Sequence, residues 1–191
     1  MEEINMKKEL GEIARISIGA SLTRYSKNYE GEKQKTDVLY CTVDEFYTKE
    51  GDIATDIDSK YLTQNGDVIF KLSEPQAAIC IDEYGDIPEN VVVSSKFVIL
   101  KPNGVEPVFL AELLNSNIAR NQILKFSEGI IKQIKKSDVA KLKFEIPTIE
   151  EQNEYVQTIK LINKEISLQK KLIIENMNLK EAIIQKTQGG E

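Results

Sequence analysis

The end of the chain is the feature that most limits the fold. Residues 148–186 contain neither proline nor glycine, and they begin with Thr148-Ile-Glu-Glu151. This is the form of a capping box, in which the threonine and glutamate side chains accept hydrogen bonds from each other's backbone N–H groups. The stretch predicts one helix of about 38 residues, about 57 Å long. Such a helix is about three times the usual length.

Apolar residues form two stripes on this predicted helix. One line contains Tyr155, Ile159, Ile162, Ile166, Ile173, Met177 and Ile184. On roughly the opposite side lie Leu161, Leu168, Leu172, Leu179 and Ile183. A helix on the surface of its own domain needs only one stripe, and too few apolar residues remain elsewhere to bury the whole helix. We therefore expect it to pack on another helix and on a second partner, with the number of helices in the coil left open.

The preceding residues 1–147 predict a separate domain in which strands dominate. Apolar runs indicate strands near residues 12–18, 37–43, 68–70, 77–81, 91–93, 97–100 and 142–146. The runs 68–70 and 77–81 flank a turn and predict a hairpin, whereas 44–65 is polar with short apolar islands. Helical spacing begins at Pro107 and predicts two short helices before residue 127. The fold class is α+β, with a domain over 1–147 and a long helix over 148–191.

Composition excludes several kinds of enzyme. The chain has no histidine, and its two cysteines, Cys41 and Cys80, lie 39 positions apart. Histidine-dependent triads and histidine-ligated zinc are therefore absent. The sequence contains no GK[ST] phosphate loop and no glycine-rich turn after a strand. The sequence offers no metal or cofactor site, and chemistry by its 31 aspartate and glutamate residues stays open.

The cysteine spacing and the lack of a signal sequence favour a cytoplasmic protein with reduced thiols. No apolar run approaches the length of about 20 residues that a membrane span needs.

Charge is unevenly distributed along the chain. The formal net charge is -6, which argues against non-specific coating of nucleic acid. Residues 37–90 contain 3 basic and 13 acidic residues, whereas residues 91–147 contain 9 basic and 5 acidic ones. We expect the acidic stretch to face away from any nucleic acid, because a single basic face is sufficient for binding.

Several short motifs, in their order and spacing, resemble one half of a type I restriction–modification specificity (S) subunit. They are residues 10–16 with 19–24, Gly66-Asp67 with the strand after it, the helix at 107–114, the loop 127–139, and Ile146-Pro147 followed by Glu150-Glu151-Gln152. Leu22 replaces the proline usual in the first loop, and residues 71–75 lack the glycine usual there. The chain has one recognition domain and one long helix, where a full S subunit has two of each.

The resemblance implies a target recognition domain similar to the specificity domain of type II adenine methyltransferases. Two such domains lie at opposite ends of an antiparallel helix pair, and each reads one half of a split DNA site. The helices space the domains and dock methyltransferase subunits and, where present, a restriction subunit. The S subunit itself catalyses nothing. Met1 favours a natural half-size subunit over a fragment.

The resemblance also indicates which residues contact double-stranded DNA. Arginine and lysine suit guanine or phosphate, glutamine suits adenine, and hydroxyl groups suit either base edges or phosphate. We expect contacts from Ser21, Thr23, Arg24, Tyr25, Lys27, Lys71, Ser73, Gln76, Lys132, Gln133, Lys135 and Lys136. For each of the three clusters, the alternative interpretation is an ordinary solvated loop, turn or charged face. Asp67 is expected to order the turn before its strand.

A chain with one domain and one helix has to pair with a second copy to complete this architecture. We expect an antiparallel homodimer through the stripe that contains Tyr155 and Ile166, with the stripe that contains Leu161 left for the methyltransferase. Twofold symmetry then predicts a split palindrome. Two other functions stay open: a regulator or decoy that pairs through the helix but no longer reads DNA, and a small carboxylate enzyme.

Overall fold

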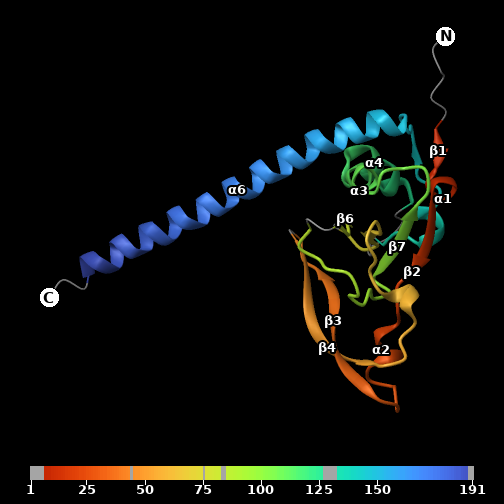
Figure 1. Ribbon diagram of the computed structural model, residues 1–191, viewed down its shortest axis with the longest axis horizontal. Helices are drawn as coiled ribbons and strands as arrows, with labels where there is room; N and C mark the ends of the chain where they lie inside the picture. The colour runs from red at the N-terminus through yellow and green to blue at the C-terminus, as the bar shows by residue number, and fades with distance from the viewer. Residues whose placement is uncertain (1–6, 44, 75, 83–84, 127–132, 189–191) are drawn as a thin grey trace, which may run out of the picture. The chain divides into compact units, whose positions relative to one another are not determined.

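The structure is a computed structural model that describes residues 7–43, 45–74, 76–82, 85–126 and 133–188. The chain divides into two compact units, residues 1–152 and residues 153–191. Figure 1 shows the strands and short helices of the first unit and the single long helix α6, Ile149–Gln188, which begins in the first unit and makes up the second.

The first unit is built on a four-stranded antiparallel sheet in the order β2-β7-β5-β6. These strands are β2 (Ala14–Ile18), β5 (Val68–Lys71), β6 (Ala78–Cys80) and β7 (Phe97–Pro102). The central strands β5 and β7 are almost wholly apolar and buried, as expected for strands covered on both faces. Helix α3 (Pro107–Asn115) packs against β5 and β6.

A second sheet consists of the long hairpin β3–β4, which pairs β3 (Lys33–Cys41) with β4 (Phe46–Ala54) in antiparallel register. Buried residues occur near both ends of the hairpin, Leu39 of β3 opposite Thr48 and Ile53 of β4 opposite Gln34. Leu39 joins an apolar cluster with Ile69 and Ile99 of the main sheet. Ile53 joins a second apolar cluster with Val38 and Val92, so the hairpin is anchored on the core at two places.

Short elements complete the first unit. Strands β1 (Lys8–Glu9) and β8 (Lys143–Phe144) pair with each other and bring the beginning and the end of the unit together. The short helices are α1 (Leu10–Ile13), α2 (Leu22–Tyr25), η1 (Ser59–Tyr61), α4 (Asn117–Phe126) and α5 (Lys136–Val139).

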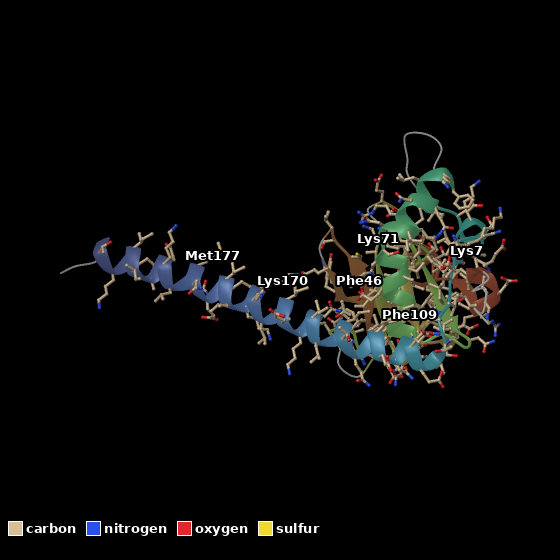
Figure 2. All side chains as sticks on the ribbon, turned by 90° about the horizontal axis from the view of Figure 1, so that it is seen from above. Lys7, Phe46, Lys71, Phe109, Lys170 and Met177 are labelled. Carbon is tan, nitrogen blue, oxygen red and sulfur yellow. The ribbon has the colours of Figure 1, made fainter. Side chains whose placement is uncertain are left out.

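Helix α6 begins with the predicted capping box. The backbone N–H of Thr148 donates to the Glu151 carboxylate at 2.9 Å, and the N–H of Glu151 donates to the Thr148 hydroxyl at 3.3 Å. Most residues of both predicted stripes are exposed, including Ile166 at 44%, Leu168 at 58% and Met177 at 65%, while Ile159 is half-buried. Figure 2 shows side chains projecting all along the helix, Lys170 and Met177 among them.

The sequence correctly predicted the α+β class, the hairpin β5–β6 and the long helix. Three local assignments were wrong. The polar stretch 44–65 contains the nine-residue strand β4, the loop after β2 contains helix α2, and residues 91–93 form isolated bridges through Val92 instead of a strand. In each case the deciding contact comes from a distant segment, such as the pairing of Val92 with Val38 and Leu62.

Candidate nucleic-acid interface

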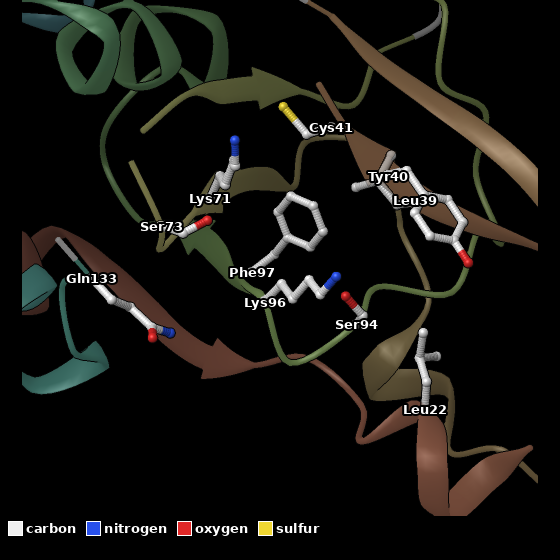
Figure 3. Close-up of a pocket in the computed structure, with 10 residues that line it drawn as sticks. All are labelled: Leu22, Leu39, Tyr40, Cys41, Lys71, Ser73, Ser94, Lys96, Phe97 and Gln133. Atoms are coloured by element: carbon white, nitrogen blue, oxygen red, sulfur yellow. The ribbon is translucent and has the colours of Figure 1, made fainter. Parts of the chain in front are cut away.

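A recess of about 430 Å³ opens beside the main sheet of the first unit. Its lining combines apolar side chains with two lysines, two serines and a glutamine, as Figure 3 shows. We call it the reading recess; its described lining residues are Leu22, Leu39, Tyr40, Cys41, Lys71, Ser73, Ser94, Lys96, Phe97 and Gln133. The recess contains three predicted residues from two separate segments of the sequence, Lys71 and Ser73 from one and Gln133 from the other.

Ser73 and Gln133 meet through the backbone although 60 positions separate them. They form an isolated antiparallel bridge, and the N–H of Ile134 donates to the carbonyl of Leu72 at 3.0 Å. Ile134 and Leu72 are both buried. The turn after β5 and the segment before α5 are therefore held together by the core, which places two predicted DNA-contacting side chains in one recess.

Lys71 and Lys96 project from adjacent strand ends. Lys71 is the last residue of β5 and lies directly opposite Phe97 of β7. The carbonyl of Lys96 accepts a hydrogen bond from the N–H of Leu72 at 3.0 Å. In Figure 3 the two lysines flank the Phe97 ring. Both ammonium groups are therefore carried by backbone that the main sheet fixes.

Two other features lie at the edge of the recess. Burial raises the pKa of the Cys41 thiol, an effect that the positive charge of Lys71 opposes. Because the thiol's pKa is raised, Cys41 stays protonated near neutral pH and is not an activated nucleophile. Tyr40 stacks on Tyr47 across the β3–β4 hairpin, with ring centroids 5.7 Å apart. This stack stabilises the part of the β3–β4 hairpin that lines the recess.

Helix α2 adjoins the recess through Leu22 and carries the predicted Arg24 cluster. The Arg24 guanidinium lies 5.5 Å from the centroid of the Tyr25 ring, and the Tyr25 ring packs on Tyr61 at 5.8 Å. Tyr25 also packs against a buried cluster that includes Val38. Tyr25 is therefore an anchor that leaves Arg24 exposed, and Ser21, Thr23 and Lys27 are also exposed.

The segment before α2 lies beside the recess because its backbone at Gly19 approaches the backbone of Val93 and Ser94 closely. A Cβ at Gly19 would clash with the carbonyl oxygens of Val93 and Ser94. The next residue, Ala20, donates its N–H to Val93 at 2.8 Å. Glycine at position 19 thus allows the chain to run beside Ser94, a lining residue of the recess, before α2 begins.

The third predicted cluster is only partly within the described residues. Lys136 begins the one-turn helix α5 and Lys135 is the N-cap residue before it, and both are exposed. Lys132 lies outside the described residues. Gln76 is half-buried and is not among the lining residues of the recess. The lysine at 96 was missed by sequence reasoning, because an isolated lysine between two apolar runs gives no signal of its own.

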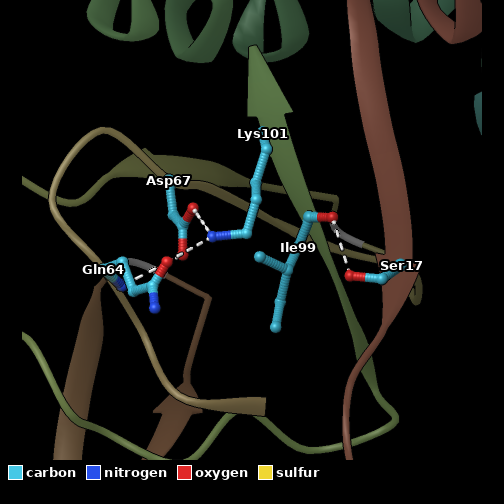
Figure 4. Close-up of polar contacts among 5 residues, drawn as sticks. All are labelled: Ser17, Gln64, Asp67, Ile99 and Lys101. Carbon is cyan, nitrogen blue, oxygen red and sulfur yellow. Dashed lines mark hydrogen bonds and ion pairs between the residues drawn. The ribbon is translucent and has the colours of Figure 1, made fainter. Parts of the chain in front are cut away.

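Asp67 has the structural role that its turn predicted. Its carboxylate accepts hydrogen bonds from the N–H of Gln64 at 3.0 Å and from Lys101 Nζ at 2.9 Å, and Figure 4 shows the arrangement around Lys101. Asp67 is 2% exposed, so its charge needs these partners. Gly66 before it adopts a φ of 83°, which glycine tolerates without strain.

Two further searches were negative within the described ranges. Residues 7–43, 45–74, 76–82, 85–126 and 133–188 contain no helix that is both long and apolar enough to cross a membrane. In that same part of the chain, no group of three or more cysteine, aspartate and glutamate side chains lies close enough to hold a metal ion.

Comparison with known proteins agrees with the class that the fold and the recess define, a strand-rich recognition domain followed by a long helix. The sequence model described as "Type I restriction modification DNA specificity domain" matches residues 2–176. The chain therefore belongs to the type I restriction modification DNA specificity domain family. No curated protein matches the chain.

Solved structures share the fold at low sequence identity. The chain is similar to the HsdS subunit from Thermoanaerobacter tengcongensis, with 21% identity and a TM-score of 0.64 over 95% of this chain and 47% of that one. It is also similar to a chain from a study of the assembly and conformational transition of the type I R-M system, with 20% identity and a TM-score of 0.63 over 96% of this chain and 48% of that one. The chain thus spans about half the length of these structures.

Proposed function

We propose that this chain is a DNA specificity subunit of a type I restriction–modification system and that it reads one half of a split DNA site. The observation that carries the proposal is the reading recess. It gathers Lys71, Ser73 and Gln133 with Lys96 in a family whose name refers to DNA specificity. Lysine, serine and glutamine side chains are those that recognise base edges and phosphates.

Residues around the recess divide into two kinds of contact. Lys135 and Lys136 are exposed at the start of α5, and together with Lys132 they suit phosphate contacts that fix the position of the domain. Arg24 is held above the anchored Tyr25 ring and suits bidentate contact with guanine. Ser21, Thr23 and Lys27 flank Arg24 in the chain and supply further polar contacts. Gln76, in the turn after β5, supplies another.

In this proposal the chain binds DNA and other subunits carry out catalysis. Residues 1–147 act as the target recognition domain in the cytoplasm, and residues 148–191 act as the spacer and docking helix. With no histidine in the chain, and no metal or cofactor required for binding, the chain's task is recognition. Methyl transfer, and DNA cleavage where a restriction subunit is present, take place on the partner subunits.

We propose that helix α6 pairs antiparallel with the α6 of a second copy. The exposed residues Ile162, Ile166, Ile173 and Met177 form one side of the helix, and an apolar stripe of this length on an isolated chain favours association. The stripe with Leu161, Leu168, Leu172 and Leu179 is left for methyltransferase subunits. A 40-residue helix is about 60 Å long, which limits the separation of the two domains to about 17 base pairs.

A binding assay tests the proposal. The chain, together with its cognate methyltransferase subunits, is titrated against a pool of random duplexes, and the bound fraction is sequenced. A specificity subunit enriches a defined split motif. No enrichment, with an intact complex between the chain and the methyltransferase, would favour a helix-paired regulator that does not read DNA. Methyl transfer by the isolated chain would contradict the non-catalytic role.

A further inference from the structure

We propose that the reading recess recognises a guanine, and that Lys71 and Lys96 are the residues that determine this preference. The inference rests on the proposed function and adds to it the identity of one base in the half-site. It also assigns a role to Lys96, which no pattern in the sequence singles out.

The charged groups that line the recess are the ammonium groups of Lys71 and Lys96. Its described lining residues include two lysines, two serines and one glutamine but no aspartate or glutamate. Among the described residues, neither Lys71 nor Lys96 lies within ion-pair distance of a carboxylate. An ammonium group donates three hydrogen bonds and accepts none. The pair of lysines is therefore suited to a partner that presents adjacent acceptor atoms.

Guanine is the base that matches this arrangement. In the major groove its N7 and O6 are both acceptors and lie side by side. Adenine sets its acceptor beside a donor, thymine sets its acceptor beside a methyl group, and cytosine presents a donor. Reading cytosine uses a carboxylate acceptor, which the described lining lacks. The two lysines therefore favour guanine among the four bases, whereas Gln133 in the same lining is of the residue type that suits adenine.

The two lysines are also better placed to read a base than Lys135 and Lys136 at the start of α5. Lys71 is paired with Phe97 in the main sheet, and the backbone of Lys96 is fixed through Leu72. Base readout needs a fixed position; Lys71 has it as a strand residue, and Lys96, in the turn before β7, has it through the hydrogen bond of its carbonyl with Leu72. The buried residues Phe97 and Leu39 line the same recess and offer the lysines no polar partner. Lys135 and Lys136, at the start of a one-turn helix, suit the less demanding contact with phosphate.

A phosphodiester also presents acceptor oxygens, so the experiment has to distinguish contacts with a guanine base from contacts with the DNA backbone. The half-site is first mapped, and each guanine in it is then replaced with 7-deazaguanine, which lacks the N7 acceptor but pairs normally. Dissociation constants are measured for the full complex with methyltransferase subunits. The proteins compared are the unmodified chain, Lys71→Met, Lys96→Met and the control Lys125→Met, which replaces an exposed lysine of α4 outside the recess.

We expect one guanine at which 7-deazaguanine weakens binding by the unmodified chain and by Lys125→Met. In Lys71→Met and Lys96→Met this sensitivity disappears, and discrimination against other base pairs at the same position falls by about 5- to 150-fold. Lys71→Arg and Lys96→Arg keep a charged donor and retain the guanine preference. Because methionine preserves the unbranched stem, both variants are expected to fold, which circular dichroism verifies.

Two results would overturn the guanine assignment while leaving the proposed function intact. One is a uniform loss of affinity for all sequences, with the salt dependence reduced by about 1 per lysine, which is the signature of phosphate contacts. The other is a mapped half-site that contains no G·C pair. If the unmodified complex bound no specific DNA at all, the proposed function itself would fail.

Discussion

Gln152 and Glu106 are joined by a hydrogen bond that ties the first turn of α6 to the start of α3. The Gln152 side-chain oxygen accepts from the backbone N–H of Glu106 at 2.8 Å, and its Nε2 donates to the carbonyl of Pro147 at 2.8 Å. Glu106 in turn caps α3 by accepting from the N–H of Phe109 at 2.7 Å. Gln152 is 1% exposed, so both of its polar groups depend on these partners.

Replacing Gln152 with alanine should therefore destabilise the first unit. The change leaves the N–H of Glu106 and the carbonyl of Pro147 without their partner, and one such buried group costs about 1–3 kcal/mol. Urea unfolding followed by circular dichroism measures the free energy of unfolding. Gln157→Ala, at an exposed glutamine of the same helix, is the control and should change stability by less than about 0.5 kcal/mol. Equal midpoints for Gln152→Ala and the unmodified chain would contradict this role.

Local signals in the sequence predicted those parts of the fold that depend on neighbouring residues. The capping box of Thr148 and Glu151 gave the start of α6, and the turn at Gly66-Asp67 gave the hairpin that follows it. Strand β4 was missed because it alternates few apolar residues and includes Gly51. It forms through register with β3 and through the contact of Phe46 with Phe97, neither of which is visible in the local pattern.

The candidate site was predicted in part for the same reason. Lys71, Ser73 and Gln133 were identified through their positions in family-like motifs, and the structure brings them into one recess. Lys96 and Ser94 were not identified, because they lie between an apolar run that forms isolated bridges and the strand β7. Their place at the recess depends on the packing of three distant segments, which one sequence does not reveal.

Removing the positive charges of Lys132, Lys135 and Lys136 together should weaken DNA binding similarly for all sequences. If each lysine neutralises one phosphate, the slope of log K against log[salt] falls by about 1 per lysine. Fluorescence anisotropy of the triple alanine variant at several salt concentrations measures this slope. An unchanged slope would remove the α5 cluster from the interface.

Arg24→Ala should affect sequence discrimination more than overall affinity. A guanidinium that contacts one guanine contributes about 1–3 kcal/mol of discrimination at that position. Competition binding with duplexes altered at each position of the half-site measures the change. A loss of the same size for every duplex would instead assign Arg24 to phosphate positioning, and Lys27→Ala, at an exposed lysine near the same helix, provides the comparison.

Ile166→Asp combined with Ile173→Asp should prevent self-association. Both residues are exposed on the same stripe of α6, and two carboxylates there would be buried in an antiparallel pair without partners. Light scattering should give twice 21.6 kDa for the unmodified chain and 21.6 kDa for the variant. Lys164→Asp with Lys171→Asp, on the polar flanks, is the control that should remain dimeric. A monomeric unmodified chain at micromolar concentration would count against the pair.

The most direct test of the central claim is single-molecule sequencing for modified adenines in a host that expresses this chain with its methyltransferase subunits. A specificity subunit that pairs with a second copy predicts one modified motif, a split palindrome whose halves contain a guanine and are separated by a fixed number of unspecified bases. Loss of this motif in the Lys71→Met and Lys96→Met variants would link it to the reading recess. A genome with no modified motif that depends on this chain would contradict the account.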